Sequence, residues 1–141
     1  MKRHIGAAAL LSIALVGPVA AMKPDKAVLK AAAAAPRGIS GRFDLRVRAT
    51  GRANGQLYLN SEDDYRDQRN LTIVVPPDVE GHLAGRLSGD PAERLKGHRI
   101  RVAGVAQRVR IVFTVGGRPS GKYYYQTHVR LADDGQLKLL D

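Results

Sequence analysis

Arginine is the residue type in this sequence that most clearly suggests a chemical role, because it recurs at alternating positions in stretches otherwise rich in Val, Leu and Ile. From residue 37 onward the chain has 15 Arg and only 3 Lys. A planar guanidinium binds phosphate through paired hydrogen bonds and stacks on nucleobases, whereas an ammonium group does neither. We therefore predict an anion-binding face of strand residues, whose members are Arg46, Arg48, Arg99, Arg101, Arg108, Arg110 and Arg130. The alternative is a merely solvated face in an Arg-rich chain.

Exposed rings beside such a face would favour single-stranded nucleic acid, since bases stack on aromatic side chains next to a basic groove. Tyr58 alternates with Leu57 and Leu59, and Tyr124 shares its phase with His128. Tyr58 and Tyr124 are therefore predicted to face outward and to serve as stacking platforms. The alternative is that both rings only cover the surface of the domain, as Tyr often does.

A run of carboxylates in one polar loop is a candidate for holding a hard cation. Its members are Glu62, Asp63, Asp64 and Asp67. The loop lacks the alternating spacing of a dedicated calcium loop, and its own Arg66 and Arg69 can pair with these acids. We therefore predict no metal site, and a small metal-dependent nuclease is the less favoured alternative.

Other catalytic chemistries lack their motifs. The chain has no Cys, which excludes thiol nucleophiles and Cys-ligated metals. The four His residues show no metal-ligand spacing, the Ser residues no nucleophile-elbow context, and the Gly residues no phosphate loop. The sequence therefore predicts no catalytic residue and no cofactor, and it favours a protein that is not an enzyme.

The N-terminal residues have the pattern of an export signal. Lys2 and Arg3 precede an uncharged apolar run, and small residues follow Pro18 up to Ala21. We predict a signal peptide over 1–21 and an exported protein, periplasmic or extracellular, without a membrane span in the mature form. An uncleaved anchor is the alternative. Removal of this segment takes two positive charges and leaves 21 Lys and Arg against 13 Asp and Glu, a net +8.

Behind the signal, the Ala-rich stretch 22–38 shows no sided apolar stripe and is predicted to be a linker. From residue 39 the hydrophobic period is two, which predicts a mainly β domain over 39–141. The Asn54-Gly55 pair predicts a hairpin, and a short helix is expected from about residue 79 to 87. The strands are expected within the stretches 41–49, 56–60, 71–75, 98–105, 107–115, 122–131 and 136–140.

Three local patterns resemble those of oligonucleotide/oligosaccharide-binding (OB) domains of small exported bacterial proteins. The stretch 95–104 reads LKGHRIRVAG and resembles a common fourth strand of that fold. The stretches 59–72 and 128–139 are similar to its second-to-third-strand region and to its closing strand. The resemblance implies a Greek-key barrel of five to six strands with one short helix between strands 3 and 4.

The fold alone does not specify an activity, because OB domains serve many functions. The arginine face and the two Tyr residues favour non-catalytic binding of an extended anionic ligand, most plausibly single-stranded nucleic acid or another polyanion. A structural module that contacts an envelope protein is the alternative.

Overall fold

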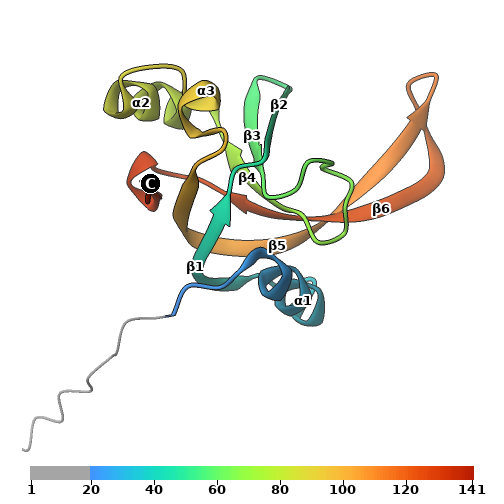
Figure 1. Ribbon diagram of the computed structural model, residues 1–141. Coiled ribbons are helices and arrows are strands. Elements are labelled where there is room, and N and C mark those ends of the chain that lie inside the picture. Colours follow the sequence, from blue (N-terminus) through green and yellow to red (C-terminus); the bar gives the residue numbers. More distant parts are fainter. Residues whose placement is uncertain (1–19) are drawn as a thin grey trace, which may run out of the picture.

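The computed structural model describes residues 20–141, which form a mainly β domain with a strongly curved sheet (Figure 1). The chain order begins with α1 (Pro24–Ala34), β1 (Ile39–Arg46), β2 (Ala49–Ala53), β3 (Gln56–Asn60) and β4 (Leu71–Val75). It continues with α2 (Pro77–Leu87), α3 (Pro91–Leu95), β5 (Arg99–Val115), β6 (Arg118–Arg130), the 3-10 turn η1 (Asp134–Gln136) and β7 (Leu137–Leu139).

The sheet follows the order β1-β5-β6-β4-β3-β2, and β7 pairs with β5. All neighbours are antiparallel except β4 and β6, which are parallel. The two ends of this path, β1 and β2, are joined by only Val47 and Arg48. The N–H of Val47 donates to the carbonyl of His98 over 2.9 Å, and that of Arg48 donates to Asn60 over 2.9 Å. One extended stretch thus hydrogen-bonds on both sides, and the sheet curls around an interior.

That interior is filled by the inward phase of each strand, as the two-residue period predicts. Its large, fully buried members are Phe43, Leu57, Leu59, Leu71, Ile73, Ile100, Leu131 and Leu137. Val79 and Leu83, one turn apart on α2, belong to the same core. Asn54 and Gly55 both have positive φ angles, 53° and 74°, so the predicted hairpin between β2 and β3 is confirmed.

Helix α1 is packed against the sheet, which corrects the expectation of an undocked linker over 22–38. Ala27 and Ala31 lie one turn apart, are fully buried and contact β1 and β5. Small side chains let the helix approach the sheet closely, so an alanine face docks without bulky apolar residues. The division at residues 21 and 38 stays a prediction, because residues 1–19 lie outside the described part of the chain.

The mainly β class is confirmed, but the strand count and the helix position are not as predicted. Residues 20–141 form seven strands, and both α2 and α3 lie between β4 and β5. The expected first strand continues through Val47 and Arg48 and is divided into β1 and β2. The stretches 98–105 and 107–115, expected as two strands, form the single strand β5, which passes through the fully buried Ala106.

The second half of β5 and the first half of β6 project from the rest of the sheet as a two-stranded ribbon (Figure 1). Strand β1 pairs with β5 only up to Ala106, and β4 pairs with β6 only from Thr127. Residues 107–126, which we call the arm, therefore have only one another as sheet neighbours. Within residues 20–141, none of the helices is long and apolar enough to span a bilayer.

Candidate functional site

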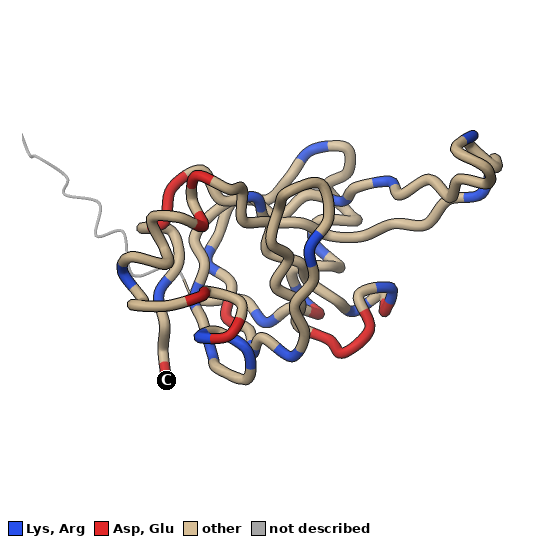
Figure 2. The backbone as a smooth tube through the Cα atoms, turned by 90° about the horizontal axis from the view of Figure 1, so that it is seen from above, with Lys and Arg blue, Asp and Glu red and all other residues tan. Residues whose placement is uncertain are grey.

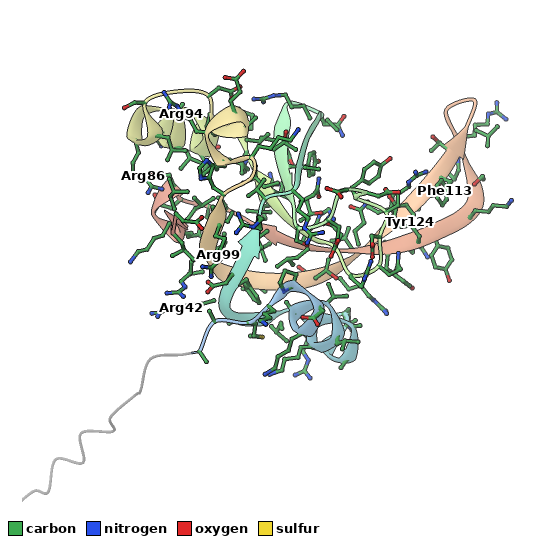
Figure 3. All side chains as sticks on the ribbon, viewed as in Figure 1. Arg42, Arg86, Arg94, Arg99, Phe113 and Tyr124 are labelled. Carbon is green, nitrogen blue, oxygen red and sulfur yellow. The ribbon has the colours of Figure 1, made fainter. Side chains whose placement is uncertain are left out.

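A groove of about 570 Å³ lies between the arm, the β2–β3 hairpin and the loop 61–70. Four aromatic side chains from these separate parts of the chain line it: Tyr58, Tyr65, Phe113 and Tyr124. Phe113 and Tyr124 face each other across the arm, with ring centres 5.2 Å apart and planes tilted by 30° (Figure 3). The groove thus brings together the two Tyr residues predicted from alternation.

The floor of the groove holds a short chain of polar contacts along β6. The side-chain amide of Gln126 donates to the hydroxyl of Tyr124 over 2.5 Å, and its oxygen is 2.8 Å from Nε2 of His128. An amide oxygen only accepts, so Nε2 carries the proton and donates. Burial lowers the pKa of His128 below its usual value, which keeps the imidazole neutral at pH 7. The ring of Tyr58 lies 6.3 Å away, centre to centre.

Burial also affects Tyr124, whose pKa is raised mainly by the removal of its hydroxyl from water. The phenol is therefore neutral throughout the physiological range. A neutral phenol and a neutral imidazole place no negative charge on the floor. The site can accommodate planar rings next to hydrogen-bonding groups.

The loop 61–70 is anchored to β3 and β4 by a buried set of hydrogen bonds around Asn70. Its amide donates to Asn60 Oδ1 over 3.1 Å and to Thr72 Oγ1 over 2.9 Å. Its oxygen accepts from the backbone N–H of Glu62 over 3.0 Å. Within residues 20–141, every buried side-chain polar atom has a hydrogen-bond partner. This anchoring positions Tyr65, whose carbonyl also accepts from the Asn70 amide.

The acids of this loop are engaged with arginines. Arg66 pairs with Asp64 over 3.2 Å, and Arg69 pairs with Asp67 over 2.8 Å. Hydrogen bonds from Arg69 lower the pKa of Asp67 to about 2. In the described part of the chain, no three His, Cys, Asp or Glu side chains are placed to share a metal ion. Glu62 forms a third ion pair, with Arg48 over 3.6 Å. Three of the four candidate cation ligands are thus in ion pairs; the candidates were Glu62, Asp63, Asp64 and Asp67.

The predicted arginines lie in separate parts of the molecule instead of on one face. Arg46, Arg48 and Arg99 line a second hollow of about 470 Å³. Arg46 lies directly opposite Arg99 in the β1–β5 pairing, and its Nη1 donates to the carbonyl of Gly97 over 2.7 Å. Figure 3 shows Arg99 far from Phe113 and Tyr124.

The remaining arginines contact other side chains. Arg101 is hydrogen-bonded to Asp44, and Arg130 donates to Gln56 over 3.2 Å. On the arm, Arg108 lies over the ring of Tyr125 at 4.0 Å and Arg110 over that of Tyr123 at 5.1 Å.

Tyr124 lies on the face of the arm that lines the groove. Arg108 and Arg110 lie on the opposite face, which we call the rear face. Within one strand, odd and even residues point to opposite faces. Arg99 and Arg101 therefore lie on a different face of β5 from Arg108 and Arg110. A role of any of these residues in ligand binding stays a prediction.

Sequence reasoning missed three residues that line the groove: Arg52, Tyr65 and Phe113. Phe113 lies in the part of β5 that projects beyond its outer sheet neighbours, and its ring is exposed. Tyr65 lies in a loop, where no periodicity exists to assign a direction. Arg52 hydrogen-bonds to Glu80 of α2.

Comparison with known proteins finds no matching family model and no matching curated protein. Among solved structures, aspartyl-tRNA synthetase from Entamoeba histolytica is similar over 87% of this chain, with a TM-score of 0.48 and 8% identity. A putative aspartyl-tRNA synthetase from Leishmania major Friedlin is similar over 99% of it, with a TM-score of 0.42 and 9% identity. This chain spans 22% and 23% of the length of those two chains.

Proposed function

We propose that the protein is a non-catalytic binder of single-stranded nucleic acid, held in the groove between the β2–β3 hairpin and the arm. The observation that carries the proposal is the set of four rings, Tyr58, Tyr65, Phe113 and Tyr124, around one groove. Bases of any sequence stack on such rings, each stack contributing about 1–3 kcal/mol.

The strand order supports an OB-like barrel as the scaffold. If β1 and β2 count as one first strand, it pairs with β3 and with β5, and β6 closes the path through its parallel pairing with β4. That is the connectivity of a five-stranded OB barrel with helices before its fourth strand. OB domains bind oligonucleotides on the strand 2–3 face and with the 1–2 and 4–5 loops. These parts correspond here to β3–β4, the β2–β3 hairpin and the arm.

The positive charge of the arm, which forms one wall of the groove, favours an anionic ligand. No Asp or Glu occurs between residues 94 and 132, a stretch that includes the whole arm. Figure 2 shows Lys and Arg along the projecting ribbon, with Asp and Glu confined to the rest of the molecule. Contacts between such cations and phosphates release counterions, so that affinity falls steeply with salt.

Export remains part of the proposal, and it rests on the sequence of residues 1–21. We do not propose the nuclease, because Asp64 and Asp67 are already held by Arg66 and Arg69. Binding, not cleavage, is the activity that the groove supports.

The test measures fluorescence anisotropy of a labelled oligothymidylate at several salt concentrations with wild type, Tyr58→Ala and Tyr124→Ala. Each variant is expected to weaken binding about 5- to 150-fold, which corresponds to the loss of one stack of about 1–3 kcal/mol. Tyr123→Ala is the matched control, because Tyr123 is an arm tyrosine on the rear face. No binding by wild type at low salt, or equal losses for all three variants, would contradict the proposal.

A further inference from the structure

The tip of the arm exposes apolar side chains that neither the fold nor the groove uses. The side chain of Val115 is 73% exposed and that of Tyr123 is 51% exposed, and neither lines the groove. Exposed apolar surface of this kind marks an interaction site in soluble proteins. Val115 has no ring on which a base could stack, so nucleic-acid binding does not account for its exposure.

The same tip is cationic. Arg110, Arg118 and Lys122 lie among these apolar residues, and no acidic residue occurs on the arm. A second copy of the tip would bring like charges together and is therefore disfavoured as the partner. The positive charge of the tip favours an anionic partner, and its exposed apolar side chains favour one with an apolar interior.

The apolar side chains lie on both faces of the ribbon. Tyr123 lies on the rear face beside Arg110, whereas Val115 follows Phe113, which lines the groove. A single flat protein surface would cover only one of these faces. A fluid interface surrounds the tip and covers both at once.

We propose that the tip of the arm docks on an anionic phospholipid bilayer, with Val115 and Tyr123 entering the interfacial region and Arg118 and Lys122 at the lipid phosphates. The site lies beyond the proposed function and does not depend on it. Tyr is typical of the interfacial layer, and basic residues near an anionic leaflet each strengthen binding about fivefold. Insertion is shallow, because the outer edges of the ribbon carry unpaired backbone groups that must stay hydrated.

The experiment is co-sedimentation of the full chain with vesicles of phosphatidylcholine alone and of equimolar phosphatidylglycerol and phosphatidylcholine. Wild type is expected to pellet with the anionic vesicles only. The variant Val115→Asp should lose this binding at least tenfold. The matched control is Leu29→Asp, because Leu29 is 72% exposed on α1 and far from the arm in sequence. Arg118→Gln/Lys122→Gln should lower the partition coefficient about 25-fold, the product of two fivefold losses.

Oligonucleotide anisotropy on the same proteins separates the two proposals. Val115→Asp should keep wild-type affinity for the oligonucleotide, since Val115 does not line the groove. The membrane proposal is overturned if wild type does not pellet with anionic vesicles, if it pellets equally with zwitterionic ones, or if Leu29→Asp loses as much as Val115→Asp. It is also overturned if Val115→Asp weakens oligonucleotide binding and leaves vesicle binding intact, since the tip then belongs to the nucleic-acid site.

Discussion

Arg101 holds Asp44 with two hydrogen bonds across the β1–β5 pair, from Nε to Oδ1 over 2.7 Å and from Nη2 to Oδ2 over 2.8 Å. The two residues are direct partners in the antiparallel register. One guanidinium thus engages both oxygens of the carboxylate, and this pair ties β1 to β5. A contact of Arg101 with a ligand stays a prediction.

The first prediction concerns the acid stability that this pair confers. The hydrogen bonds from Arg101 lower the pKa of Asp44 below its unfolded value of about 3.9. The stabilisation is thus fully present above about pH 4 and is lost as the pH falls through the lowered pKa of the folded state. Urea unfolding should show that Asp44→Asn lowers stability at pH 7 and flattens the decline between pH 4 and pH 2. An unchanged decline in the variant would show that other carboxylates cause it.

The second prediction tests the docking of α1. Ala31→Leu places a large side chain where the helix meets the sheet, so it should lower the free energy of unfolding by about 1–3 kcal/mol. Ala33→Leu, on the exposed side of the same helix, should change it by less than about 0.5 kcal/mol. Equal effects of the two substitutions in chemical denaturation would mean that the helix is not packed.

The third prediction concerns the anchor of the loop 61–70. Asn70→Ala leaves the buried Asn60 and Thr72 side chains without their amide donor, which costs about 1–3 kcal/mol of stability. The loop should also become more sensitive to trypsin at Arg66, as limited proteolysis and mass spectrometry would detect. Asp63→Ala in the same loop is the control and should keep wild-type stability and cleavage rate.

The fourth prediction concerns His128. Burial lowers its pKa in the folded state below the unfolded value of about 6.5, so the unfolded chain binds the proton more readily. The contribution to stability is therefore present above about pH 6.5 and is lost as the pH falls. His128→Gln should show a smaller loss of stability between pH 7.5 and pH 5 than wild type. An NMR titration giving His128 a pKa at or above 6.5 would contradict this.

Much of the architecture could be predicted from local sequence. Alternation identified the inward residues Phe43, Leu57 and Leu59, because a strand with one buried face must bury every second side chain. The Asn54-Gly55 pair located the first hairpin, because a tight hairpin turn needs positive φ angles and these two residue types adopt them readily. The docking of helix α1 was missed, since an alanine face carries no hydrophobic contrast and reveals its packing only when the opposing sheet is known.

The site was predictable only in part, because it depends on where a strand leaves its neighbours. Tyr58 and Tyr124 were assigned outward correctly from alternation, and the structure places both along the same groove. The arginines of β5 were grouped wrongly, because the sequence was divided near residue 106. An unbroken strand puts Arg101 and Arg108 on opposite faces. Nothing local reveals that residues 107–126 lack outer neighbours, which is a property of sheet topology.

The unbroken course of β5 and β6 separates the two walls of the groove mechanically. The sheet holds both strands at Ala106 and Thr127, and the ribbon beyond them is attached to the domain at that end alone. One wall of the groove, with Tyr124, is on this ribbon, whereas the opposite wall, with Tyr58, is on the main sheet. Bending of the ribbon relative to the main sheet would therefore change the width of the groove.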